Sequence, residues 1–253
     1  MDSVPRRGTP VETLVTADPE SLAVTAADLL LRSIHDAIAA RGRARVVLSG
    51  GSTPRATHRA LARALRAEPV ERIDWFFGDE RWVAVTDPDS NEGMARGTLL
   101  GDSGAPEATI HSWQAGGDDP RACAGRYAEI VRATVPPGAP SFDVVLLGMG
   151  ADGHTASLFP GATAFLPDGR DLPVSAALPG VAAAVTRPAA PSSWRLTLCP
   201  QSLSNSRMVA FLVTGADKAS ALAKARAGAA DTPAAWVRGE KTYFIVTRDA
   251  MSD

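Results

Sequence analysis

The sequence is poor in residues that hold metals or form disulfides. Only two cysteines occur among the 253 residues, Cys123 and Cys199, and they form no Cys-x-x-Cys pair. The four histidines are scattered, without His-Glu-x-x-His or a comparable ligand spacing. These absences argue against a structural zinc site and against a disulfide-rich scaffold. We therefore expect no metal, and we expect a reducing compartment.

Long apolar runs and an excess of charge are also absent. The first eight residues lack the apolar segment of a signal peptide, and no stretch approaches the roughly 18 apolar residues that span a bilayer. Lys and Arg number 26 against 28 Asp and Glu, so the formal charge is −2. A protein that coats nucleic acid needs a cationic excess. We expect a cytoplasmic protein that binds neither membranes nor nucleic acid.

What remains is the composition of a globular protein, with 45% hydrophobic and 21% charged residues. A chain of this length buries roughly 70 to 75% of its unfolded surface, so its core needs no covalent staple. The proline-rich segment at 136–140 is the best candidate for a domain boundary, but five residues more often form a loop. We predict a single domain over residues 1–253.

Helical and strand patterns alternate along the chain. Apolar residues recur at helical spacing over 18–42, 54–67, 91–100, 120–135 and 217–227. Short apolar runs at 45–48, 73–77, 142–147, 194–198, 208–213 and 242–246 indicate buried strands. This alternation predicts the α/β class, with three layers and a mainly parallel sheet covered by helices on both faces. Ligands of such sheets bind at the carboxyl ends of the strands.

The first of these ends carries a glycine-rich loop, Ser-Gly-Gly-Ser-Thr-Pro at 49 to 54, directly before a helix. Gly51 lets backbone amides approach an anion, and the hydroxyls of Ser52 and Thr53 can donate as well. The helix dipole favours a phosphate at this position. A tight turn with a helix cap is an equally good interpretation of this loop taken alone. The loop matches neither a P-loop nor a dinucleotide fingerprint.

A charged segment, Asp79-Glu80-Arg81, follows the next strand. Adjacent charges beside a buried aromatic strand are costly unless they face solvent, form ion pairs or meet a polar ligand. A surface turn is the more ordinary interpretation of such a segment. The position at a strand's carboxyl end favours a ligand site instead.

The most specific segment is Gly-Met-Gly-Ala-Asp-Gly-His-Thr-Ala-Ser-Leu-Phe-Pro at 148 to 160. Its three glycines permit a sharply bent backbone that places Asp152 and His154 at the mouth of the sheet. Imidazole titrates near neutral pH, so it can take a proton from water and return it to a leaving oxygen. A single histidine is usually structural, but the glycines and the nearby carboxylate favour a catalytic His154 oriented by Asp152.

Two cations complete the set of candidates. Lys218 lies in the first turn of a predicted helix after Val-Thr-Gly, where a cation is unfavourable against the helix dipole. Arg195 begins a predicted strand and can reach the same place. Either both are merely solvated, or they bind an anion together with the glycine-rich loop.

Taken together, these motifs resemble those of the 6-phosphogluconolactonases in the branch related to glucosamine-6-phosphate deaminases. The resemblance also includes Ser-Asn at 90 to 91, Met-Ala-Arg at 94 to 96, Arg-Leu-Thr-Leu at 195 to 198 and Thr-Gly-x-x-Lys at 214 to 218. The motifs follow the family's order and cover most of the chain. The glycine-rich loop alone is a weak signal, whereas the histidine segment is a strong one.

The resemblance implies a modified Rossmann-like fold and hydrolysis of 6-phospho-D-glucono-1,5-lactone to 6-phosphogluconate in the oxidative pentose phosphate pathway, without metal or organic cofactor. We expect a monomer or weak homodimer whose partner is a small sugar-phosphate lactone. By position, the phosphate would be held by Gly51, Ser52, Thr53, Arg195 and Lys218. His154 would be the general base, and Asp79, Arg81 and Asp152 would shape the site around the lactone.

Two alternatives stay open at this point. Deaminase relatives carry an acidic residue five positions after the histidine, where this chain has Phe159, so the lactonase is favoured over an amino-sugar-phosphate deaminase or isomerase. A non-enzymatic sugar-phosphate sensor would need a DNA-binding module, and no helix-turn-helix is recognisable before the first core strand. Glu92 and Gly93 depart from the family's pattern, so we assign Asn91 only a helix cap.

Overall fold

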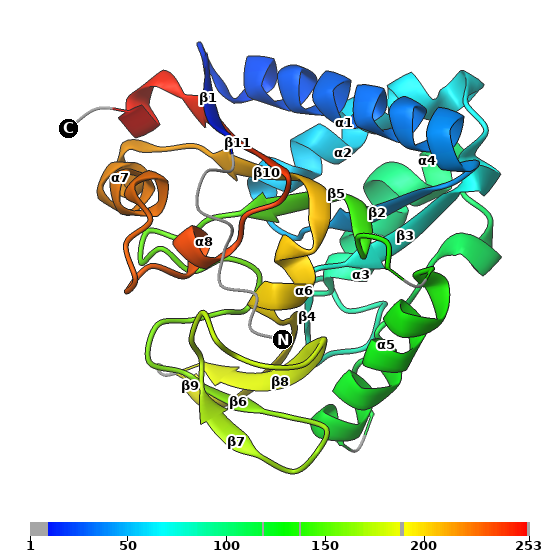
Figure 1. Ribbon diagram of the computed structural model, residues 1–253. Coiled ribbons are helices and arrows are strands. Elements are labelled where there is room, and N and C mark those ends of the chain that lie inside the picture. The colour runs from blue at the N-terminus through cyan, green and yellow to red at the C-terminus, as the bar shows by residue number, and fades with distance from the viewer. Residues whose placement is uncertain (1–9, 118, 137, 188–189, 252–253) are drawn as a thin grey trace.

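The computed structural model describes residues 10–117, 119–136, 138–187 and 190–251. Two sheets organise these residues, one above the other in the view of Figure 1. The upper sheet has six strands, all paired in parallel, in the order β1-β11-β10-β5-β2-β3. Its strands are β1 (Val11–Thr16), β2 (Ala44–Leu48), β3 (Ile73–Phe77), β5 (Phe142–Gly148), β10 (Ser206–Val213) and β11 (Lys241–Thr247).

The predicted parallel sheet is therefore confirmed. Strands β2 and β3 are buried along their whole length, which is why they appear in the sequence as unbroken apolar runs. Strand β1 is an edge strand that the sequence analysis did not identify. Its residues are all exposed or half-buried, and its apolar and polar residues do not alternate regularly, so it gives only a weak strand pattern.

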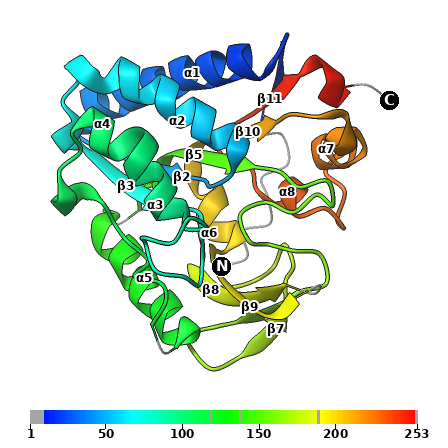
Figure 2. The ribbon, with the colours of Figure 1, turned by 180° about the vertical axis from the view of Figure 1, so that it is seen from behind.

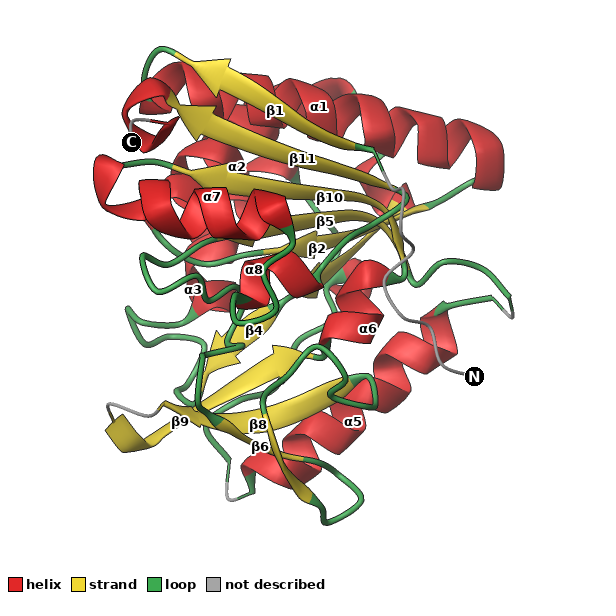
Figure 3. Ribbon diagram, turned by 60° about the vertical axis from the view of Figure 1, so that its left-hand side comes forward, coloured by secondary structure: helices red, strands yellow, loops and turns green. Residues whose placement is uncertain are grey.

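Helices cover both faces of this sheet. Helix α1 (Pro19–Arg41) lies on one face and α7 (Ala219–Ala227) on the other, as Figure 3 shows. The bounds of α1 follow from its caps, because the Asp18 carboxylate accepts the N–H of Ser21 and Gly42 takes a left-handed φ of 78°. The three-layer α/β arrangement agrees with the fold class expected from the sequence.

Helix α2 (Ser52–Ala64) packs beside α1 and follows the glycine-rich loop. The predicted helix over 91–100 is divided into α3 (Asn91–Ala95) and a π-helical turn, Arg96–Leu100, that packs on α2. Figure 2 shows α2, α3 and α4 (Gly101–Ser103) gathered on one side. The remaining helices are α5 (Pro120–Thr134), α6 (Pro200–Ser204) and α8 (Pro233–Trp236).

The second sheet is antiparallel and was not predicted. Its order is β4-β9-β8-β6-β7. The strands are β4 (Asp79–Arg81), β6 (Thr163–Phe165), β7 (Asp171–Pro173), β8 (Ala182–Arg187) and β9 (Ala190–Leu198). The predicted strand at 194–198 belongs to β9 of this sheet, so its implied place in the parallel sheet was wrong. Helix α5 packs on β8 and β9.

The two sheets share one hydrophobic core. A single cluster of buried side chains includes Leu48 and Phe76 of the parallel sheet together with Ala164 and Leu196 of the antiparallel sheet. The second sheet can therefore hold its side chains in a fixed position beside the carboxyl ends of the first. Within the described part of the chain, we find no helix with the length and apolar character needed to cross a membrane.

Candidate active site

The loops after β2, β3, β5 and β10 converge on one cavity of about 340 Å³, and strand β9 of the second sheet borders it. All four loops were expected to meet at this edge. The predicted site residues that line the cavity are Gly51, Ser52, Thr53, Asp79, Arg81, His154, Arg195 and Lys218. Asp152 is not among the lining residues, but it contacts His154 directly.

The glycine-rich loop forms one end of the cavity. Gly51 is the N-cap of α2 and has a φ of 107°, which favours glycine, and its position provides no side-chain cap. The amides of Ser52 and Thr53 at the first turn of α2 therefore border the cavity without a capping side chain in front of them. The hydroxyl of Thr53 lies 3.0 Å from that of Thr214, which ties this loop to the loop after β10.

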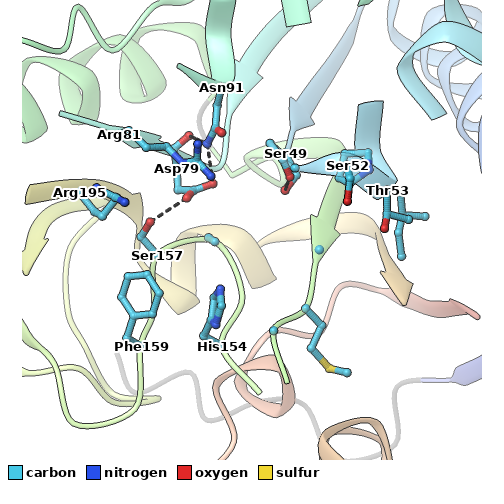
Figure 4. Close-up of a pocket in the computed structure, with 18 of the residues that line it drawn as sticks. Ser49, Ser52, Thr53, Asp79, Arg81, Asn91, His154, Ser157, Phe159 and Arg195 are labelled. Carbon is cyan, nitrogen blue, oxygen red and sulfur yellow. Dashed lines mark hydrogen bonds between the residues drawn. The ribbon is translucent and has the colours of Figure 1, made fainter. Parts of the chain in front are cut away.

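His154 lines the cavity (Figure 4), and its ring forms a close pair with the carboxylate of Asp152. Nδ1 of His154 lies 2.5 Å from Oδ1 of Asp152, and the same oxygen accepts the backbone N–H of His154 at 3.1 Å. Burial by itself raises the pKa of Asp152, but the hydrogen bonds from His154 outweigh it and hold that pKa below its usual value. A charged carboxylate at Nδ1 selects the Nδ1–H tautomer, which leaves Nε2 as the proton acceptor.

The loop that carries this pair is held by its own backbone. The N–H of Gly150 donates to the carbonyl of His154 at 2.9 Å, and the N–H of Gly153 donates to the carbonyl of Gly150 at 3.0 Å. Gly153 has a φ of 80° and packs against Thr232. Ala156, which lines the cavity, has a φ of 48°, a conformation that residues with a Cβ rarely adopt. The loop is thus fixed in one bent form.

Asp79 is buried and lines the cavity, so the surface-turn interpretation of the charged segment was wrong. Its carboxylate accepts the Ser157 hydroxyl at 2.7 Å and the Asn91 side-chain amide at 3.2 Å. The first of these bonds is drawn in Figure 4. Burial raises the pKa of Asp79, and the Ser157 hydrogen bond opposes that rise.

Glu80, the neighbour of Asp79, points away from the cavity and holds the start of α3. Its carboxylate accepts the backbone N–H groups of Arg81, Asn91 and Glu92 and the hydroxyl of Ser90. Burial raises its pKa, and these backbone donors oppose the rise. The strand β4 is therefore a rigid support, with one carboxylate facing the cavity and the next fixing the helix beside it.

Asn91 has a different role from the helix cap predicted for it. The cap is Ser90, whose side chain accepts the N–H of Gly93, and Asn91 is the first residue of α3. Its side-chain amide also donates to the carbonyl of Asp79 at 2.9 Å. The same amide occupies the space where a Cβ on Gly50 would stand. Asn91 therefore joins the glycine-rich loop to Asp79, at the cavity wall.

The residues that depart from the family's pattern have local explanations. Glu92 is buried and accepts hydrogen bonds from Arg96 and from the Ser112 hydroxyl. Gly93 has no room for a side chain, because a Cβ there would collide with the carbonyl of Val85. Gly93 thus lets α3 pack closely on the preceding loop, and Glu92 fixes α3 to residues that follow it.

Among the lining residues to which the sequence gave no role in the site are Asn91, Ser157, Phe159 and Arg187. The first three lie within the Ser-Asn motif at 90 to 91 and the histidine segment at 148 to 160, and the motif at Phe159 indicates only that a carboxylate is absent there. Its ring lies 4.8 Å from that of His154, between ring centroids. Arg187 gave no signal, because the strand that ends on it was not predicted.

The cations occupy two regions of the cavity. Arg81 on β4 stands directly opposite Arg195 on β9, and both lie beside Asp79, whereas Ser52 and Thr53 lie across the cavity (Figure 4). Burial, and then the nearby charges of Arg81 and Arg187, lower the pKa of Arg195. Lys218 ends a short 3₁₀ turn after β10.

No group of three or more potential metal ligands of the His, Cys, Asp or Glu type occurs among the described residues. The two cysteines are buried, and burial raises their pKa, to about 11 for Cys123 and about 12 for Cys199. Neither thiol is activated as a nucleophile. The chemically active groups of the cavity are therefore the imidazole, the carboxylates and the cations.

Comparison with known proteins gives a consistent result. A family model described as glucosamine-6-phosphate isomerases/6-phosphogluconolactonase matches residues 17–245. A 6-phosphogluconolactonase of a Synechocystis strain is 40% identical over 201 residues, 78% of each chain. One of Mycobacterium tuberculosis is 36% identical over 244 residues, 93% of this chain and 95% of the relative.

A solved structure of a 6-phosphogluconolactonase from Thermotoga maritima superimposes with a TM-score of 0.77 at 25% identity, covering 94% of this chain and 100% of the other. The family model spans the whole antiparallel sheet and the parallel sheet except β1 and the end of β11, and it includes every residue of the cavity named above. The chain therefore belongs to the family of glucosamine-6-phosphate isomerases and 6-phosphogluconolactonases.

Proposed function

We propose that this protein hydrolyses 6-phospho-D-glucono-1,5-lactone to 6-phosphogluconate, a step of the pentose phosphate pathway, with His154 as the base that activates water. The relatives at 34 to 40% identity over most of the chain are 6-phosphogluconolactonases. The observation that carries the catalytic assignment is the Asp152–His154 pair, 2.5 Å apart, on a rigid loop that opens onto the cavity.

The reaction needs two proton movements that one imidazole can perform in turn. Nε2 of His154 takes a proton from water as the water oxygen bonds to C1, and a tetrahedral oxyanion forms. The oxyanion collapses, the bond from C1 to the ring oxygen breaks, and the ring oxygen receives the proton from His154. The carboxylic acid so formed loses a proton at neutral pH, so each turnover releases one proton.

Asp152 supports both steps through Nδ1. Its carboxylate holds the ring in the tautomer with a free Nε2 and stabilises the imidazolium that forms between the two transfers. Phe159, packed against the ring, restricts its rotation. We assign Asp152 to orientation and electrostatic stabilisation, not to proton transfer.

The oxyanion needs donors, and the arginine side of the cavity can supply them. Arg81 is the first candidate, because its guanidinium borders the cavity beside Asp79. The loop amides near Gly150 are the second candidate. Asp79, held by Ser157 and Asn91, lies where it can accept a sugar hydroxyl and fix the position of the ring.

The phosphate is assigned to the glycine-rich end, with Gly51, Ser52, Thr53 and Lys218 as its partners. The family resemblance groups Arg195 with them, but Arg195 lies beside Asp79, across the cavity from Ser52 and Thr53 (Figure 4). The support for this assignment is a helix N-terminus with open amides, two hydroxyls and a lysine on one cavity. Anchoring the phosphate would hold C1 near His154, so that attack becomes effectively intramolecular.

The test is a comparison of two reactions on the purified protein. Freshly generated lactone should disappear, with one proton released per molecule, far faster than it hydrolyses spontaneously. Glucosamine 6-phosphate should release no ammonia above background, because Phe159 replaces the carboxylate of the deaminases. Ammonia release at a rate comparable to lactone hydrolysis would reverse the assignment.

A further inference from the structure

Three arginines converge on one end of the cavity. Arg81 and Arg195 are cross-strand partners on β4 and β9, directly opposite each other. Like charges at directly opposed positions destabilise an antiparallel pair. The arrangement is therefore unfavourable for the strands themselves, and its cost would be offset by an anion placed between the two guanidinium groups.

Arg187 brings a third positive charge to the same place. It is the last residue of β8, which pairs with β9 on the other side from β4, and the register of this pairing shifts between Thr186 and Arg187. The guanidinium carbon lies 5.5 Å from the centre of the Phe159 ring, and the residue lines the cavity. Arg187 thus extends the arginine side toward the residue that packs on His154.

The described acidic residues do not neutralise this group. None of the three guanidinium groups lies within 4.0 Å of a described carboxylate. Arg81 donates to the carbonyl of Asp89, and Arg195 donates to the Ser193 hydroxyl and the Trp194 carbonyl. The carboxylate of Asp79 is already bound by Ser157 and Asn91.

The charges nevertheless act on one another. Burial, then Arg81, then Arg187 lower the pKa of Arg195, while Asp79 and Asp89 raise it by less. A protein with a formal charge of −2 that gathers three cations at one cavity end concentrates a positive potential there. An oxyanion fits this potential and can accept from several guanidinium N–H groups at once.

We propose that Arg187, together with Arg81 and Arg195, forms an anion subsite that holds an oxyanion group of the sugar acid, either its carboxylate or its phosphate. This inference rests on the proposed function for the identity of the sugar acid. The product carries two anionic groups, and the cavity has two cationic ends, Lys218 with the glycine-rich loop at one and the three arginines at the other. Arg187 is the member of the subsite that no sequence motif indicated.

The experiment measures product binding by calorimetry for the wild type, Arg187→Ala, Arg187→Gln and the control Arg170→Ala. Arg170 is exposed, pairs with Asp168 and does not line the cavity. We expect the Kd for 6-phosphogluconate to rise about 10-fold or more in both Arg187 variants, the usual effect of losing a charged hydrogen bond. Arg170→Ala should bind like the wild type.

Two further ligands identify the anion that Arg187 contacts. Glucitol 6-phosphate has the phosphate but no carboxylate, and gluconate has the carboxylate but no phosphate. If Arg187 contacts the phosphate, its loss weakens glucitol 6-phosphate and leaves gluconate unchanged. If it contacts the carboxylate, the reverse holds. Either pattern supports the subsite.

The outcome that overturns the subsite is a Kd for 6-phosphogluconate within twofold of the wild type in both Arg187 variants. Arg187 is exposed, so melting temperatures should be unchanged, and the two variants guard against a folding artefact in one of them. A separate measurement on the wild type tests the proposed function. If the wild-type protein neither hydrolyses the lactone nor binds 6-phosphogluconate, the proposed function itself is refuted.

Discussion

Replacing Gly150 by alanine should lower kcat strongly without unfolding the protein. A Cβ on Gly150 would stand 2.6 Å from Oδ1 of Asp152 and closer still to the His154 ring. Ordinary carbon contacts begin near 3.4 Å, so both side chains would have to move by about 1 Å. The φ of Gly150 is not positive, so the backbone itself tolerates alanine.

The size of the effect follows from this displacement. A shift of about 1 Å in a reacting group costs on the order of 100-fold in rate. The 2.5 Å contact between Asp152 and His154 would be lost as well, so we expect kcat to fall about 10² to 10³-fold. The phosphate-binding end is untouched, so KM should change little.

The assay is steady-state proton release from fresh lactone, with Gly148→Ala as the matched control. Gly148 lies in the same segment, and its nearest neighbour would be the Ser49 hydroxyl at 3.9 Å, an ordinary contact. This variant should keep kcat within a few-fold of the wild type. If Gly150→Ala retained full kcat with an unchanged melting temperature, the Asp152–His154 geometry would be irrelevant to the reaction.

Three further predictions concern anchoring, acid stability and metal dependence. Lys218→Ala should raise KM about 10-fold or more with little change in kcat, because a phosphate contact is present in both the ground state and the transition state. A fall in kcat alone would contradict the anchoring role. Burial lowers the pKa of His58 from 6.5 to about 4. Between pH 6.5 and pH 4 the unfolded state therefore binds a proton at His58 that the folded state does not bind. The free energy of unfolding falls as the pH drops through this range. In urea unfolding, the free energy of unfolding should fall by about 2 to 3 kcal/mol between pH 7.5 and 4.5 because of this residue. His58→Leu should remove this fall. An equal fall in that variant would show that other groups cause the acid sensitivity. Treatment with a strong chelator followed by desalting should leave kcat unchanged, because His154 and the cations supply the proton transfer and the charge stabilisation. A loss of activity that added metal restores would show that the site was misinterpreted.

The parallel sheet was predictable from the sequence because all its strands except the edge strand β1 are mostly buried and therefore stand out as apolar runs. The antiparallel sheet was not predicted, because most of its strands do not form such apolar runs. Strand β4 is three charged residues, and β8 is alanine-rich, so neither has a strand's usual composition. Their pairing is decided by long-range contacts with β9, which no local pattern reveals.

The same division applies to the site. His154, Asp152 and the glycine-rich loop were predictable, because each lies within one short motif whose chemistry is local. The joining role of Asn91 was not, since it depends on Glu80 holding the start of α3 and on the space left by Gly50. Arg187 enters the cavity only because β8 pairs with β9.

The most direct test of the central claim is the kcat for fresh 6-phosphogluconolactone in His154→Ala against the wild type, with folding confirmed by circular dichroism. We predict a fall of about 10² to 10⁴-fold, the usual contribution of a general base, with KM nearly unchanged. A folded His154→Ala protein that hydrolyses the lactone at the wild-type rate would contradict the account.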